Sequence, residues 1–244
     1  MDTRHHEYVG TLGKAAIFKR LSPETLARLS GGTTEAQFNR GCVVFGCGAI
    51  ATGLYVVASG HLKLCLETPE GIEHVVELIE AGDSFGEAAL LTSLTSRSHH
   101  VTATAVTDCQ LLHVARHSLL AELERDPELA RRIIGTLSER LYRQTSTIEN
   151  VLFRKAPGRV ARFILDCLKT DSAKASRRVV LPVRKGLIAS HLNMTQEHFS
   201  RTLRELIKSG LIRVDHDMVD VIEIDKLRAL GGMARAPEYL LAAE

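Results

Sequence analysis

Hydrophobic and polar positions divide the chain into stretches of different period. From about residue 36 to 114, short runs rich in Val, Leu and Ile alternate with turns such as Ser59-Gly60 and Ala81-Gly82-Asp83. Strands are expected at 54–57, 62–66, 74–79 and 101–105. Short helical patterns lie before them, at 11–30, where Leu21-Ser22-Pro23-Glu24 is typical of a turn followed by a capped helix. Short, regularly punctuated strands are typical of an antiparallel jelly roll or sandwich. The first half of the chain is therefore predicted to be mostly β-structure.

A long helix is predicted from 126 to about 151. Asp126 can cap its N-terminus, and Pro127 suits its first turn. Apolar residues then recur at alternating spacings of three and four residues, provided that the polar Gln144 is counted as one position of the repeat. This spacing is typical of a coiled-coil seam. The predicted seam consists of Ile134, Leu137, Leu141, Ile148 and Val151. An ordinary amphipathic helix lying on a core is the alternative, because only about three heptads are present.

A helix-turn-helix pattern follows. A helix over 186–192, a turn over 193–195 and a helix over 196–209 that ends at Gly210 precede a predicted hairpin over 212–222. The second helix carries Phe199, Leu203 and Leu206 on one face and Gln196, Glu197, Ser200, Arg201, Arg204 and Lys208 on the other.

The polar face has the chemistry of a DNA-reading helix. Such a helix lies in the major groove, where arginine can grip guanine, glutamine adenine and glutamate the amino group of cytosine. Glu197 and Arg201 are four residues apart, so each can hold the other in position. A solvent-facing helix with such pairs is the alternative. The hairpin, which would form a wing, favours a winged helix-turn-helix.

The distribution of charge supports this interpretation. The net charge of +2 conceals 14 Lys/Arg against 18 Asp/Glu in residues 1–152, and 17 against 11 in residues 153–244. The balances are −4 and +6, so a polyanionic partner is expected for the C-terminal part alone. No nucleophile, base and orienting group occur together in a recognisable pattern, so an enzyme is not predicted.

Cellular context follows from what the sequence lacks. No apolar run reaches the roughly 18 residues of a membrane span, and the N-terminus has no secretory apolar core. The five cysteines contain no C-x-x-C pair. Free thiols, a reducing environment and a cytoplasmic location are therefore expected, with no membrane partner.

A second constellation lies in the predicted β-domain. Phe85-Gly86-Glu87 is followed, ten residues beyond the glutamate, by Arg97-Ser98. A glycine lets backbone amides approach an anion, and an arginine beside a hydroxyl can hold a phosphate. A nearby carboxylate can accept a hydrogen bond from a ribose hydroxyl. Gly86, Glu87, Arg97 and Ser98 are therefore candidate ligand-binding residues.

The order of these parts resembles the CRP/FNR family of bacterial transcription regulators over nearly the whole chain. The run Glu197-His198-Phe199-Ser200-Arg201 is similar to the E-x-x-S-R pattern of the FNR and Dnr branches, and Gln196 replaces the first arginine of the cAMP receptor branch. The resemblance implies an α+β chain: a β-roll effector-sensing domain (1–125), a dimerisation helix (126–153) and a winged helix-turn-helix domain (154–244). It also implies a homodimer that binds a palindromic TTGAT-like site on double-stranded DNA and contacts RNA polymerase.

The constellation around Gly86 resembles the phosphate-binding cassette of cyclic-nucleotide-binding domains, F-G-E-x-A-L-L followed by R-S-A. The resemblance implies that Gly86 and Glu87 hold a ribose, and that Arg97 and Ser98 hold a cyclic phosphate. A cAMP-like cyclic nucleotide is thus the implied effector. Two positions depart from the family pattern: His99 replaces an alanine, where its ring could crowd the pocket, and Gln144 replaces the first residue of a threonine–serine pair that contacts the base. Thr145 keeps the hydroxyl of that pair.

Other kinds of sensor would require different residues. An iron–sulfur sensor needs clustered N-terminal cysteines, and residues 1–41 contain none. Cys42 and Cys47 are interpreted as buried thiols of the β-roll, and the histidines of the sensor, His74, His99 and His100, as solvated side chains. No metal site is predicted. Haem stays open as a ligand, which would give a haem- or nitric-oxide-sensing regulator like Dnr. The further alternative is a cyclic-nucleotide-responsive regulatory protein that acts through protein contacts.

Overall fold

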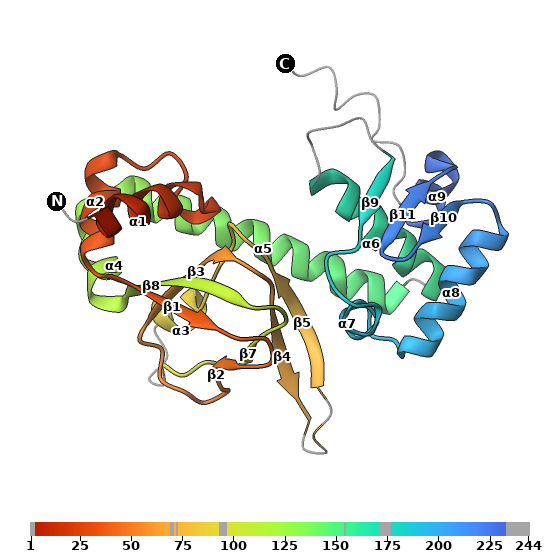
Figure 1. Cartoon of the computed structure of the whole chain (residues 1–244), viewed down its shortest axis with the longest axis horizontal. Helices are drawn as coiled ribbons and strands as arrows, with labels where there is room; N and C mark the ends of the chain where they lie inside the picture. The colour runs from red at the N-terminus through yellow and green to blue at the C-terminus, as the bar shows by residue number, and fades with distance from the viewer. Residues whose placement is uncertain are drawn as a thin grey trace. The chain divides into compact units, whose positions relative to one another are not determined.

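A computed structural model describes residues 3–68, 71, 73–92, 97–153, 155–170 and 177–232. Contacts divide the chain into two compact units, Met1–Tyr142 and Arg143–Glu244, and each is described by itself (Figure 1). The predicted domain limits at 125/126 and 153/154 remain a prediction. In the described part of the chain, no helix is long and apolar enough to cross a membrane.

The first unit begins with three short helices, α1 (Thr3–Lys14), the 3-10 helix η1 (Ala16–Phe18) and α2 (Pro23–Gly31). Ser22 caps α2: its hydroxyl accepts a hydrogen bond from the Thr25 amide at 3.2 Å, and Pro23 occupies the first helical position. This start follows the sequence prediction, because both signals depend only on neighbouring residues.

Two four-stranded antiparallel sheets form a β-roll, which confirms the predicted antiparallel β-domain. One sheet has the order β1 (Thr33–Phe38), β8 (Cys109–Ala115), β3 (Gly53–Ser59) and β6 (Ser84–Phe85). The other has the order β2 (Val43–Phe45), β7 (Thr102–Ala105), β4 (Leu62–Glu67) and β5 (Glu73–Ile79). The four predicted strand runs correspond to β3, β4, β5 and β7. Helix α3 (Glu87–Leu91) follows β6, and α4 (Arg116–Arg125) follows β8.

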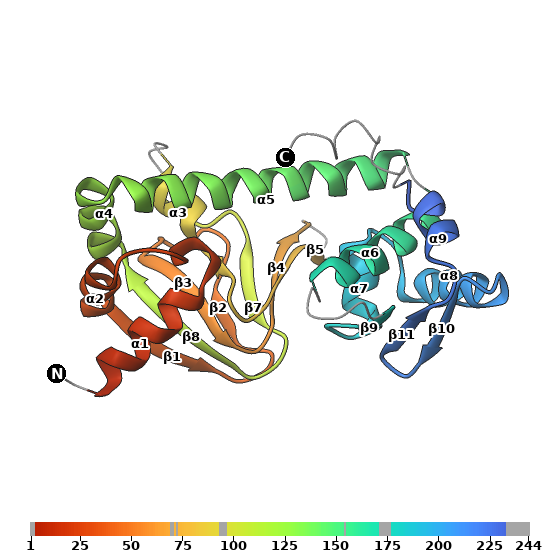
Figure 2. The same ribbon diagram turned by 90° about the horizontal axis from the view of Figure 1, so that it is seen from above.

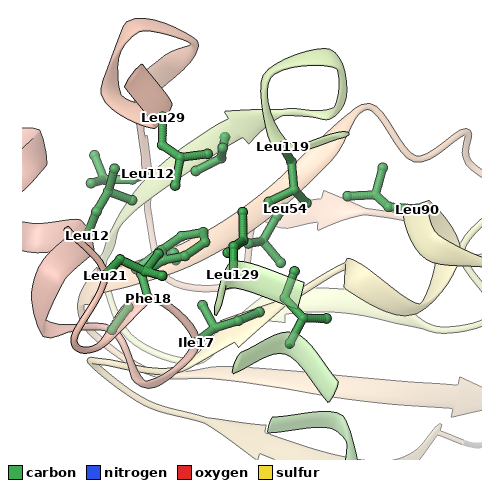
Figure 3. Close-up of a cluster of buried hydrophobic side chains, with 14 of the residues drawn as sticks. Leu12, Ile17, Phe18, Leu21, Leu29, Leu54, Leu90, Leu112, Leu119 and Leu129 are labelled. Carbon is green, nitrogen blue, oxygen red and sulfur yellow. The ribbon is translucent and has the colours of Figure 1, made fainter. Parts of the chain in front are cut away.

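The core of this unit includes the beginning of the long helix, α5 (Pro127–Phe153). Leu129 is fully buried and Ile133 is 3% exposed, and both belong to one cluster with α1, η1, α2 and the strands. Figure 3 shows Leu129 among Ile17, Phe18 and Leu54. The first turns of α5 are thus an integral part of the core of the first unit.

Helix α5 has a second apolar side. Ile134, Leu141 and Ile148 are spaced seven residues apart and are 63%, 65% and 59% exposed. Leu137, which the spacing assigns to the seam, packs against the core of the first unit, as expected for a residue one turn after Ile133. The side chain of Val151 lies outside the described residues. The expected single stripe is therefore divided between a core-facing side and an exposed side.

The second unit is built from α6 (Ala156–Thr170), α7 (Lys185–His191), α8 (Gln196–Lys208) and α9 (Ile224–Leu230) around a three-stranded antiparallel sheet. The sheet has the order β10 (Ile212–Asp215), β11 (Met218–Val221) and β9 (Arg178–Val180). Val160 and Ile164 of α6, Phe199 of α8 and Val219 of β11 meet in its core. The predicted helix-turn-helix and wing are therefore confirmed.

Candidate functional site

Helix α8 begins and ends at residues that the sequence marks. The Thr195 hydroxyl caps it by accepting a hydrogen bond from the His198 amide at 3.2 Å. Gly210 follows its end with φ +69°, a left-handed conformation that suits glycine. Phe199, Leu203 and Leu206 are buried against the rest of the unit. The orientation of α8 is fixed by this apolar face.

The opposite face of α8 brings the predicted DNA-reading residues together. Gln196, Glu197, Arg201 and Arg204 are exposed and Ser200 is half-buried. Among the described residues, the structure shows no ion pair between Glu197 and Arg201, although both are exposed on this face. The Arg204 Nε donates to the Ser200 carbonyl at 3.3 Å. A Cβ on Gly186 of α7 would lie 2.9 Å from the Gln196 Oε1, so that glycine leaves room for the Gln196 amide.

The wing follows α8 directly. Strands β10 and β11 pair from Ile212↔Val221 to Asp215↔Met218, and His216 turns the chain with φ +53°. Arg178 of β9 donates to Asp220 of β11 at 2.6 Å, which ties the third strand to the hairpin. The wing is therefore held as part of a sheet.

In the first unit, the predicted cassette begins where β6 joins α3. Gly86 has φ +93°, and a Cβ there would lie 3.3 Å from the Gly53 carbonyl oxygen and 3.6 Å from the His99 Cε1. A larger residue would be both strained and crowded at this position. Glu87 begins α3 and is only 1% exposed. Its Oε2 is buried and makes no hydrogen bond to any described residue.

The partners of Glu87 are not among the residues predicted from the sequence. Arg140 of α5 donates through Nη1 to the Glu87 Oε1, and through Nε and Nη2 to the Glu77 Oε2 of β5 at 2.7 and 2.6 Å. Figure 2 shows α5 running past α3. Burial lowers the pKa of the Arg140 guanidinium, but Glu87 and Glu77 raise it by more, so the net pKa is raised. One sequence feature could have indicated that Arg140 lies near the cassette: it stands one helical turn before the candidate residue Gln144.

The second half of the cassette is held by backbone hydrogen bonds. The Arg97 carbonyl accepts from the Ala51 amide at 2.9 Å, and the His99 amide donates to the Ala49 carbonyl at 2.9 Å. The Arg97 side chain is exposed, while Ser98, half-buried, forms a β-bridge with Ile50. Because the His99 ring lies beside Gly86, the two halves of the cassette meet at this ring.

His99 itself was expected to be solvated, and this expectation is wrong. Its ring is 5% exposed and stacks on Phe45 with centroids 3.5 Å apart and planes 10° from parallel. Burial, and to a lesser degree His100, lowers the pKa of His99. His74 and His100 are exposed, as expected. The residue that replaces the family alanine therefore fills space beside the cassette glycine.

The expectation of buried thiols at Cys42 and Cys47 is also wrong. Both residues are exposed at the two ends of β2, and the buried thiols are those of Cys65 and Cys109. None of the five cysteines, all of which the structure describes, forms a disulfide bond. Within the described ranges, no group of three or more His, Cys, Asp or Glu side chains is placed to hold a metal ion.

Two further candidate residues lie beyond the contact boundary of the first unit. Gln144 and Thr145 are exposed on α5, one turn and slightly more beyond Arg140. Their position relative to the cassette stays a prediction.

A β-roll with this cassette, joined to a winged helix-turn-helix with an exposed polar face, defines a class of transcription regulator. The model for the cyclic nucleotide-binding domain matches residues 35–126, and the model for the Crp-like helix-turn-helix domain matches residues 158–230. The chain belongs to the CRP/FNR family of transcription regulators.

Individual relatives agree with this assignment. The nitrogen fixation regulation protein FixK of Azorhizobium caulinodans is 31% identical over 73% of this chain and 71% of its own length. The CRP-like cAMP-activated global transcriptional regulator of Mycobacterium tuberculosis is 25% identical over 88% of this chain and 96% of its own. The structure of FixK2 from Bradyrhizobium japonicum shares the fold, with a TM-score of 0.72 at 23% identity over 84% of this chain and 99% of that chain.

Proposed function

We propose that the protein is a homodimeric regulator that reads a palindromic TTGAT-like site with α8 and responds to an effector in the β-roll. The observation that carries this proposal is the polar face of α8. Its DNA-reading candidates stand on one exposed side, while the opposite side anchors the helix in the core. A helix presented in this way can enter a major groove without rearrangement of its own unit.

The exposed side of α5 supports a homodimer. Ile134, Leu141 and Ile148 are large apolar residues that are each more than half exposed, one heptad apart. Burying such residues against the same stripe of a second copy removes apolar surface from water, and a twofold axis makes the stripe complementary to itself. The two copies of α8 in the dimer would then bind two half-sites that lie about one DNA turn apart.

A cAMP-like cyclic nucleotide is the proposed effector. The family model for the first unit is that of a cyclic nucleotide-binding domain, and the mycobacterial relative is named as cAMP-activated. The residues fit such a ligand: Gly86 lets a ligand approach the backbone, and the buried Glu87 Oε2 can accept a hydrogen bond from a ribose hydroxyl. Arg97 and Ser98 would hold the cyclic phosphate. Contact of the DNA-bound dimer with RNA polymerase belongs to the same proposal.

A gel shift on a TTGAT-N4-ATCAA duplex tests the DNA-binding part. Arg201→Ala is expected to weaken binding by roughly 10- to 100-fold, equivalent to about 1–3 kcal/mol for one good base contact. Affinity should also fall steeply as salt is raised, because phosphate contacts release counterions. Arg228→Ala, which removes an arginine from α9 outside the reading face, is the control. Equal binding by wild type and Arg201→Ala would overturn the assignment of α8.

A further inference from the structure

Glu77 binds Arg140, an arginine that also binds the candidate effector residue Glu87. Its Oε2 accepts from both Nε and Nη2 of Arg140, while the Arg140 Nη1 donates to Glu87. The three side chains are 14% exposed for Arg140, 15% for Glu77 and 2% for Glu87. Two carboxylates and one guanidinium thus share a poorly solvated volume with a net charge of −1.

The balance of charge makes this arrangement unfavourable for an anionic ligand. Adding Arg97 brings the net charge of the four groups to zero, so a cyclic nucleotide with its single phosphate charge would raise the local charge to −1. Two N–H donors of Arg140, arranged in the fork that suits a phosphate or carboxylate, are already taken by Glu77. An anionic effector gains these donors only by displacing Glu77.

We propose that Glu77 determines the affinity and charge selectivity of the effector site by competing with the effector for Arg140. This proposal rests on the proposed function, in which a cyclic nucleotide binds at the Gly86–Ser98 cassette. Since Arg140 belongs to α5 and Glu77 to β5, displacement of Glu77 also releases a contact between β5 and α5. Effector binding and the position of α5 are thereby coupled through one guanidinium.

Isothermal titration of the full-length protein with cAMP tests the competition. Glu77→Gln keeps the shape and removes the charge. It is expected to tighten cAMP binding by about tenfold or more, because the charge of Glu77 no longer holds Arg140, and a charge pair a few ångströms apart in protein surroundings contributes well above thermal energy. Glu80→Gln is the matched control: it removes an exposed carboxylate just beyond the end of β5. Its affinity should stay within about twofold of wild type, as for a screened surface charge.

Each outcome decides a separate point. Tighter binding by Glu77→Gln alone supports the proposal, including the case in which the wild type shows no binding. Equal tightening by both variants, or no change in either, overturns the role of Glu77, while binding by the wild type still supports the proposed effector class. No binding by any of the three proteins at millimolar cAMP overturns both. If Glu77→Gln does not fold, Glu77→Asp, whose shorter side chain holds Arg140 less well, should still bind cAMP more tightly than wild type, and unchanged affinity contradicts the proposal.

Discussion

The two units present their candidate functional residues in opposite ways. In the DNA-binding unit, the candidate residues lie within three turns of one helix, and all but the half-buried Ser200 are exposed: Gln196, Glu197, Ser200, Arg201 and Arg204. In the sensor, Glu77, Glu87 and Arg140 come from β5, α3 and α5 and are largely buried against one another. An exposed face needs only a partner of complementary charge. A buried cluster already has internal partners, which a ligand must replace.

This difference separates binding from stability. A substitution on the exposed face of α8 changes contacts that exist only in a complex, so the fold is expected to tolerate it. A substitution in the sensor cluster leaves a buried charge uncompensated, so it changes the free energy of unfolding and the response to an effector together. The comparison can be tested by variants that are chemically alike but lie in different units or on different faces.

The largest effect is expected from Arg140→Met. This variant leaves Glu87 and Glu77 without their counter-ion, and loss of one partner of a buried ion pair costs about 3–5 kcal/mol. Arg204→Met on the exposed face of α8 is the counterpart and should change the free energy of unfolding by less than about 0.5 kcal/mol. Urea denaturation of the two variants measures both values. Similar losses in both would remove the distinction between the units.

A smaller contrast is expected within α5, where adjacent isoleucines face different ways. Ile133 is 3% exposed in the sensor core, so Ile133→Ala should cost about 2–5 kcal/mol of stability. Ile134 is 63% exposed, so Ile134→Ala should leave the stability of the single chain nearly unchanged and weaken the dimer. Denaturation and sedimentation equilibrium separate the two effects. A dimer that is unaffected by Ile134→Ala would show that the exposed stripe is not the seam.

Local signals account for most of what the sequence predicts correctly. The cap at Ser22, the turn at 193–195 and the hairpin after Gly210 depend on a few adjacent residues, and the structure contains all of them. The face of α8 follows from helical period alone, so its polar residues could be grouped without knowledge of the fold. The cassette resembles a known motif and was found for that reason.

Non-local pairing accounts for what was missed. Strand β1 pairs with β8 in a register that joins Thr33 to Val114, and neither strand was predicted as a separate run. The Arg140–Glu77 and Arg140–Glu87 pairs join residues 63 and 53 positions apart, which no local pattern indicates. The contact of Leu137 with the core was missed for a related reason: α5 has two apolar sides, and only the position of the core shows which residues contact it.

The smallest effect concerns acid stability and again contrasts the units. Burial lowers the pKa of His99 below its ordinary value of 6.5. Below that pH the unfolded chain binds a proton that the folded chain excludes, so the free energy of unfolding should fall as the pH drops, by up to about 1.4 kcal/mol per pH unit for one histidine. His99→Phe keeps a ring on Phe45 and removes the proton, so its dependence on pH should be shallower.

His113 sets a limit on that change, because burial lowers its pKa as well and its contribution to the acid dependence would persist in His99→Phe. His216→Gln, which replaces an exposed histidine at the tip of the wing, is the control and should retain the acid dependence of the wild type. The urea midpoints of the wild type and the two variants, measured between pH 7 and pH 5, give the dependence of stability on pH for each protein. If His99→Phe loses stability as steeply as the wild type, the acid sensitivity comes from other groups. The stacked ring beside Gly86 would then act through its shape alone.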